Sequence, residues 1–205
     1  LWEGRPVHVR TPREASALGI ETVHQDLALC DNLDIVQNMF LGRELLQWGL
    51  LDEPKMEVTA TKTLSELSVT TVRSIRQHVG SLSGGQRQAV AVARAVMWDA
   101  KLVILDEPTA ALGVSQTAMV LELIRNLSSR GIAVLFVSHN LNDVFEVADQ
   151  VAVLHLGRMA RTGPIAEFDT QRIVELITTG TLSRSGAGTD SGVRTAGNPH
   201  EPGES

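Results

Sequence analysis

Apolar and polar positions repeat with two different periods along the chain, and the two periods predict different elements. A helical period of three to four residues runs through residues 83–97 and again through 114–130. Short continuous apolar runs occupy residues 102–105 and 132–137, and such runs are typical of strands buried on both faces of a parallel sheet. Strands that alternate with helices predict an α/β fold with a mainly parallel sheet flanked by helices.

Weaker signals predict further elements on both sides of these four. In chain order they are a strand–turn–strand unit over residues 1–10, a helix from Thr11-Pro12 to Gly19, a strand over 20–24, helices over 34–41 and 52–68, a helix over 140–148, a hairpin across Gly157 and a helix over 170–179. Residues 69–81 show neither period, so the pattern leaves their structure open.

Composition restricts the class of protein. The 205 residues are 43% hydrophobic and 20% charged, which is enough apolar side chain for one globular domain. No apolar run reaches 18 residues, so no membrane span is expected. The single cysteine excludes a disulfide framework. A net charge of −6 argues against nucleic acid as a partner.

The composition changes near the C-terminal end. Residues 181–205 hold five Gly, four Ser and two Pro, with Leu182 and Val193 as the only large aliphatic residues. Such a segment cannot bury enough surface to offset its chain entropy. We therefore expect an ordered domain over residues 1–180 and a disordered tail over 181–205.

The stretch Ser83-Gly84-Gly85-Gln86 stands at the start of the clearest predicted helix. A Ser at the N-cap with Gln three residues later is a capping box, which is a common structural motif. Two glycines at a helix N-terminus also expose consecutive backbone N–H groups, and the helix dipole behind them favours an anion such as phosphate. The residues alone leave both interpretations open.

Two adjacent carboxylates, Asp106 and Glu107, directly follow the apolar run 102–105. Neighbouring side chains at a strand end point in different directions, so they can perform different tasks. One can hold a hard cation such as Mg²⁺, and the other can orient an attacking water as a general base. The alternative is a helix N-cap or a solvated turn.

Polar residues follow three separate predicted strands. Gln25 follows the first strand, Asp106 and Glu107 follow the second, and His139 follows the third. A lone histidine at a strand end is usually a hydrogen-bonding residue, but the carboxyl ends of parallel strands meet at the edge where ligands bind in open α/β sheets. The coincidence predicts a ligand site at that edge.

These motifs together resemble the ATP-binding cassette (ABC) ATPase family over residues 1–180. The resemblance implies a P-loop NTPase-like sheet with a helical subdomain over about 34–81, and it implies these roles: Leu82–Gln86 as the family signature, Asp106 as the Walker B aspartate, Glu107 as the catalytic glutamate, His139 as the switch histidine and Gln25 as the Q-loop glutamine. It further implies that Asp106 and Gln25 hold Mg²⁺, and that Ser83, Gly84, Gly85 and Gln86 bind ATP held by a partner subunit.

The run Ala110-Ala111-Leu112-Gly113 occupies the position of the D-loop, where many cassettes carry Ser-Ala-Leu-Asp, so Gly113 lacks the usual carboxylate. Residues 25–29, 38–44 and 108–113 are similar to bacterial importers of the ribose, xylose and fructose type. That similarity implies an ATP-hydrolysing subunit that couples hydrolysis to sugar uptake at the cytoplasmic face of the membrane. Its partners would be a second ATPase subunit, permease subunits and, through the permease, an extracytoplasmic sugar-binding protein.

Two other functions stay open: a soluble ABC ATPase without a transport role, and an inactive cassette that serves as an interaction module. A P-loop requires Gly-x-x-x-x-Gly-Lys, and none of the three lysines, Lys55, Lys62 and Lys101, follows a glycine. Because residue 1 is Leu, we expect a truncated cassette that lacks its N-terminal strands and P-loop helix and is inactive by itself. A naturally degenerate cassette is the rival interpretation.

Overall fold

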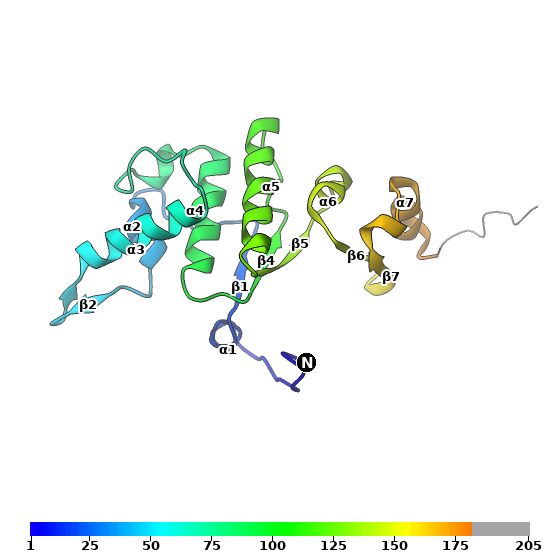
Figure 1. Cartoon of the computed structure of the whole chain (residues 1–205), viewed down its shortest axis with the longest axis horizontal. Helices are drawn as coiled ribbons and strands as arrows, with labels where there is room; N and C mark the ends of the chain where they lie inside the picture. Colours follow the sequence, from blue (N-terminus) through cyan, green and yellow to red (C-terminus); the bar gives the residue numbers. More distant parts are fainter. Residues whose placement is uncertain (182–205) are drawn as a thin grey trace, which may run out of the picture. The chain divides into compact units, whose positions relative to one another are not determined.

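The computed structural model describes residues 1–181, so the tail predicted over 181–205 lies, beyond its first residue, outside the described residues. The chain divides into two compact units, of which the first is Leu1–Ala148 and the second begins at Asp149 (Figure 1). Within the described residues, no helix has the length and apolar character that crossing a membrane requires.

The first unit alternates strands and helices, as the pattern predicts. Its elements are α1 (Pro12–Ala17), β1 (Ile20–Val23), α2 (Ile35–Phe40), β2 (Leu46–Gln47), β3 (Leu50–Leu51), α3 (Glu53–Glu66), the 3₁₀ turn Val79–Ser81, α4 (Gly84–Val96), β4 (Leu102–Asp106), α5 (Val114–Ser129), β5 (Ala133–Val137) and α6 (Leu141–Val147). The Thr11 side chain caps α1, and Ser83 forms a capping box with Gln86 at the start of α4. The predicted helix starts at these two residues are confirmed.

The central sheet of the first unit is parallel, with the strand order β1-β4-β5. The buried Val103 and Leu105 of β4 belong to one core cluster that also includes residues of α4 and α5. On the neighbouring strand β5, the side chains of Leu135 and Val137 are 51% and 46% exposed. The prediction of burial on both faces is therefore wrong for β5, because its alternate side chains face solvent, whereas every residue of β4 is buried or half-buried.

The first ten residues form no strand–turn–strand unit. Trp2 and Arg5 make one isolated antiparallel bridge around a tight turn with Gly4 at φ +78°, and residues 6–10 have no regular structure. The alternation of Val7 and Val9 misled the prediction, because the described structure gives that segment no strand with which to pair.

Residues 34–81 contain the two helices α2 and α3, both of which contact α4. Their buried side chains belong to the same core cluster as those of β4, so the structure groups this segment with the rest of the first unit. A separate helical subdomain over this range stays a prediction. The small hairpin β2–β3 within it was not predicted; its turn residues Trp48 and Gly49 both have positive φ, as a type I′ turn requires.

The segment 69–81, which the pattern left open, is an irregular loop followed by the 3₁₀ turn. The Arg76 guanidinium in this loop donates hydrogen bonds to the carboxylates of Asp34, Glu53 and Glu57. Ion pairs between residues far apart in the chain produce no repeating pattern of apolar and polar positions. The pattern therefore predicted no element in this segment.

The second unit is small. An antiparallel hairpin of β6 (Gln150–His155) and β7 (Arg158–Pro164) turns at Leu156-Gly157, and α7 (Thr170–Thr179) packs against β6 after the 3₁₀ turn Ile165–Glu167. The hairpin and the final helix are confirmed, and Gly180 ends α7 in the left-handed conformation that the pattern assigned to a stop.

Candidate functional site

The register of the sheet brings the carboxyl ends of three strands to one edge. Val23 of β1 pairs with Leu105 of β4, and Asp106 pairs with Val137 of β5. Gln25 and His139 each follow their strands by two residues. The predicted convergence of the Gln25, Asp106, Glu107 and His139 segments at one sheet edge is thus present in the fold.

Glu107 and His139 are in direct contact. The Nδ1 atom of His139 lies 2.8 Å from Oε2 of Glu107. The Glu107 side chain is 21% exposed and the His139 side chain is 78% exposed, so the carboxylate lies in the wall of the site and the imidazole lies at its surface. The backbone N–H of Glu107 also donates to the carbonyl of Val137 at 2.9 Å, which joins the ends of β4 and β5.

The backbone at Glu107 has an uncommon conformation. Its φ is +48°, in the left-handed region that residues with a Cβ seldom adopt. The turn that follows is closed by a hydrogen bond from the Ala110 N–H to the Glu107 carbonyl at 3.1 Å. Such a conformation costs on the order of 1–3 kcal/mol and tends to occur at functional sites that hold it in place.

Asp106 is half-buried at the end of β4, and Gln25 is exposed in the bend after β1. Among the described residues, no group of three or more His, Cys, Asp or Glu side chains could hold a metal ion. Mg²⁺ bound with a nucleotide needs no such group, because it keeps waters and takes phosphate oxygens beside one or two protein ligands. One carboxylate and one amide oxygen at a shared edge therefore fit Mg²⁺.

The signature segment forms the start of α4. The Ser83 hydroxyl accepts from the Gln86 N–H at 3.3 Å, while the Gln86 amide accepts from Ser83 N and donates to the Thr71 carbonyl at 2.7 Å. The structural interpretation of this motif as a capping box is confirmed. The Gln86 side chain is occupied by its hydrogen bonds to the backbone of Ser83 and Thr71. Phosphate binding by Ser83, Gly84 and Gly85 stays a prediction.

The two signature glycines also pack closely against the chain that follows Glu107. A Cβ on Gly84 would lie 2.8 Å from Cδ2 of Leu112, and one on Gly85 would lie 2.6 Å from Cε of Met119. In the described part of the chain, no hydrogen bond or ion pair joins the signature to the Glu107–His139 pair. The connection between the two groups runs instead through the packing of Leu112, five residues after Glu107.

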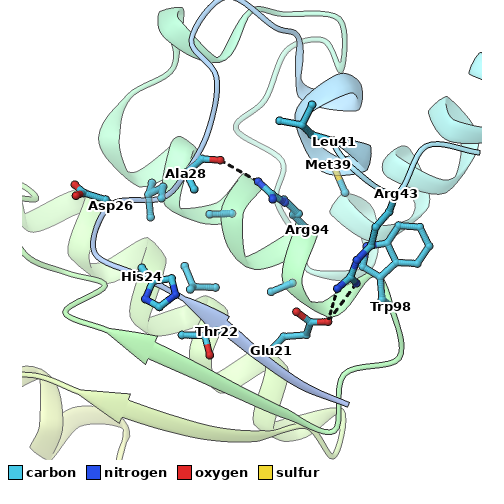
Figure 2. A pocket seen from close by; sticks show the side chains of 14 residues that line it. Glu21, Thr22, His24, Asp26, Ala28, Met39, Leu41, Arg43, Arg94 and Trp98 are labelled. Atoms are coloured by element: carbon cyan, nitrogen blue, oxygen red, sulfur yellow. Dashed lines mark hydrogen bonds and ion pairs between the residues drawn. The ribbon is translucent and has the colours of Figure 1, made fainter. Parts of the chain in front are cut away.

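A cavity of about 190 Å³ opens beside the segment that follows β1 (Figure 2). The Arg94 side chain of α4 reaches across it and donates to the Ala28 carbonyl at 3.0 Å. At its other end Arg43 pairs with Glu21 at 3.2 Å and lies 5.5 Å from the centre of the Trp98 ring. The cavity is thus lined both by apolar side chains such as Met39 and Leu41 and by the charged side chains of Glu21, Arg43 and Arg94.

Sequence reasoning missed two buried polar residues near the site. The Thr109 hydroxyl donates to the Asp143 carboxylate at 2.6 Å, and both residues are buried. The two lie 34 positions apart, so no local pattern links them. Neither residue carried a signal that distinguishes it from a solvated polar position.

The parallel sheet and its helices make this an α/β protein. The carboxylates and the histidine at the carboxyl ends of the strands indicate that its ligand site lies at that edge. Residues 1–110 match the family model described as ABC transporter. The chain therefore belongs to the ABC transporter family, as part of its ATP-binding cassette.

Curated relatives are sugar import proteins. The chain is 51% identical over 163 residues to the fructose import ATP-binding protein FrcA of Rhizobium meliloti, covering 76% of this chain and 63% of that protein. It is 43% identical over 188 residues to the xylose/arabinose import ATP-binding protein XylG of Sulfolobus acidocaldarius, covering 92% of this chain and 74% of that protein. The chain thus spans just under two thirds of the fructose relative's length.

Solved structures share the fold. CbiO1 of Clostridium perfringens, part of an ABC transporter complex, superposes with a TM-score of 0.69 at 22% identity over 87% of this chain and 71% of that chain. A dimeric post-hydrolysis ATP-binding cassette with ADP and Pi bound gives a TM-score of 0.61 at 23% identity, over 77% of this chain and 68% of that chain. These similarities confirm the predicted P-loop NTPase-like cassette fold.

Proposed function

We propose that the chain is part of the ATP-hydrolysing subunit of a sugar importer, and that the sheet edge around Glu107 is its hydrolytic site. The observation that carries the proposal is the 2.8 Å contact between Glu107 and His139 beside Asp106. A carboxylate in the wall of the site can accept a proton from an attacking water, and an imidazole at the surface can reach a phosphate. The sugar import relatives favour monosaccharide uptake as the coupled process.

The residues of the edge divide the work of phosphoryl transfer. Glu107 accepts a hydrogen bond from the attacking water and so orients it. His139, from its exposed position, donates a hydrogen bond to the γ-phosphate. Asp106 and Gln25 would hold Mg²⁺, which neutralises phosphate charge when bound. Catalysis of this kind rests on positioning and on charge stabilisation.

Nucleotide binding is proposed to involve two copies of the subunit. Ser83, Gly84 and Gly85 present a hydroxyl and backbone N–H groups at the N-terminus of the 13-residue helix α4, where the helix dipole favours phosphate. These groups would contact ATP held by the partner copy. The 205 residues contain no P-loop motif, so the proposal for hydrolysis concerns the whole protein.

The cavity beside Ala28 is the proposed docking place of the membrane permease. His24 and Asp26, the two neighbours of Gln25, line it, so a partner seated there could move the segment that carries a proposed Mg²⁺ ligand. Its mixed charged and apolar lining suits a short amphipathic segment of the permease. The subunit would thereby lie at the cytoplasmic face of the membrane, and the sugar-binding protein would act through the permease.

The test is sugar uptake by proteoliposomes that contain the whole protein and its permease, with ATP supplied on the side of the ATPase. Uptake of labelled fructose, xylose or ribose that requires ATP and is lost in Glu107→Gln supports the proposal. ATP hydrolysis without permease association would favour the soluble ATPase instead. Binding to the permease without hydrolysis by the whole protein would favour the inactive interaction module.

A further inference from the structure

The turn after β4 and the start of α6 are joined by a buried hydrogen bond. The Thr109 Oγ1 atom lies 2.6 Å from Oδ2 of Asp143, and the two residues are 8% and 5% exposed. Thr109 follows Glu107 by two positions, and Asp143 follows His139 by four. The bond therefore ties together the two segments that carry the proposed hydrolytic residues.

Asp143 has few other partners. Within the described residues no cation pairs with its carboxylate, and the Thr109 hydroxyl is the donor that reaches it. Its place in the first turn of α6 gives it a favourable interaction with the helix dipole. Burying a carboxylate still costs free energy, and a well-packed apolar pair of the same size can be as stable. Stability alone therefore does not call for a Thr–Asp pair at this point.

The conformation of Glu107 and its contact with His139 need a further interaction to hold them in place. The His139 side chain is 78% exposed, and a solvent-exposed contact with a carboxylate contributes little to holding either group. Glu107 also has a strained φ of +48°, which persists only when the surrounding structure fixes it. The buried bond lies in a medium of low dielectric, where a hydrogen bond is stronger than in water.

We propose that Thr109 and Asp143 form a positioning pair that holds Glu107 and His139 in register for ATP hydrolysis. Neither residue touches the nucleotide in this scheme. The pair holds the turn that carries Glu107 against the loop that carries His139, so its effect on the hydrolysis rate passes through Glu107. The inference rests on the proposed hydrolytic role of Glu107.

The first experiment compares Thr109→Val with Thr109→Ser in the whole protein. Valine matches threonine in shape and removes the donor, whereas serine keeps the hydroxyl. We expect Thr109→Val to lower kcat about 10- to 100-fold, because small misplacements of a catalytic group cost this much. The KM for ATP should change less than about twofold, since the nucleotide contacts are made by other residues. Thr109→Ser should recover most of the rate.

The matched control is Thr63→Val, which removes a half-buried threonine hydroxyl that donates to the Thr59 carbonyl in α3 at 3.0 Å. It should leave kcat unchanged. Asp143→Asn is the second variant, because it keeps an acceptor oxygen of the same size and should lose less rate than Thr109→Val. Equilibrium ATP binding and thermal unfolding are measured for every variant, so that a misfolded protein is recognised.

The decisive measurement combines Thr109→Val with Glu107→Gln. If Thr109 acts through Glu107, the valine substitution has no further effect on the hydrolysis rate once Glu107 is an amide. An equal proportional loss in both backgrounds, a wild-type rate in Thr109→Val, or no recovery with serine would each overturn the positioning role while leaving the hydrolytic role of Glu107 intact. A wild-type rate in Glu107→Gln alone would overturn the proposed hydrolytic role, and the positioning role with it.

Discussion

The Oε2 atom of Glu107 lies 2.8 Å from Nδ1 of His139, and this contact bridges the ends of two adjacent parallel strands. The carboxylate belongs to the turn after β4, and the imidazole to the loop between β5 and α6. A contact between two strand ends forms only when both loops are in place. The contact thus makes the chemistry of one residue depend on the placement of the other.

The first prediction concerns Glu107→Gln in the whole protein. An amide has nearly the shape of the carboxylate but cannot accept the proton of the attacking water. Loss of general-base assistance should lower the single-turnover hydrolysis rate by about 10²–10⁴-fold. ATP affinity should stay close to that of the wild type, so an ATP-bound dimer should accumulate and be visible by light scattering.

Asp106→Asn is the matched control for this substitution. It changes the neighbouring carboxylate in the same way, but it should weaken the proposed Mg²⁺ site and so reduce nucleotide affinity together with rate. Equilibrium nucleotide binding separates the two variants. Hydrolysis near the wild-type rate in Glu107→Gln would contradict the general-base role and make His139 the leading candidate.

The second prediction concerns coupling to the permease. Gln25→Ala removes the amide between His24 and Asp26, two residues that line the cavity in Figure 2. Transport-stimulated hydrolysis should fall on the order of tenfold, a typical coupling between sites, and basal ATP binding should fall less than this, although it also loses one proposed Mg²⁺ ligand. Gln47→Ala, an exposed glutamine in β2, should leave both unchanged. Cross-linking that places residues 26–40 away from the permease would refute the coupling role.

The third prediction concerns Arg76, which joins the loop 69–81 to three carboxylates. Hydrogen bonds from its guanidinium to Asp34, Glu57 and Glu53 raise the pKa of Arg76 above its ordinary value. Asp34 is only 7% exposed, so removing its cation leaves a nearly buried charge. Arg76→Ala should lower the free energy of unfolding by about 1–3 kcal/mol, between the values for exposed and buried pairs.

The control is Arg130→Ala, whose guanidinium makes one exposed ion pair with Glu66, and it should cost less than about 1 kcal/mol. A group with a raised pKa contributes stability at every pH below its unfolded pKa. Arg76 stays charged between about pH 6 and 9. The difference in free energy of unfolding between the wild type and Arg76→Ala should therefore show no pH dependence from titration of Arg76 in this range. Urea unfolding of both variants measures it, and equal costs for the two would disprove the special role of Arg76.

The fourth prediction compares two glycines that share a backbone conformation. Gly19 and Gly42 have φ of +78° and +80°, but a Cβ on Gly19 would lie 3.2 Å from the Lys101 N atom, whereas one on Gly42 would meet open space. Gly42→Ala should cost about 1–2 kcal/mol from the left-handed backbone alone. Gly19→Ala should cost about 1–3 kcal/mol more, because the neighbouring backbone cannot give way. Equal melting temperatures for the two variants would contradict this.

Much of the site could be predicted from the sequence because its signals are local. The capping box at Ser83 follows from residues three positions apart. The strand ends near Gln25, Asp106 and His139 follow from the apolar runs that precede these residues. The loop 69–81 and the hairpin β2–β3 escaped prediction. Arg76 is held by partners from 19 to 42 positions away, and two-residue strands are too short to show a period.

Outside residues 1–10 and the β2–β3 hairpin, the sequence by itself determined which elements form and which polar residues stand at their ends. The reason is that helix and strand periods and caps depend on neighbours within a few positions. Only the tertiary structure decided which strands pair, that Leu135 faces solvent, and that Glu107 touches His139. It also joined Thr109 to Asp143 across 34 positions. The physical reason is that burial and hydrogen bonding between distant segments depend on the register of the sheet and on the packing of its helices. Neither the register nor the packing can be predicted from a short stretch of sequence.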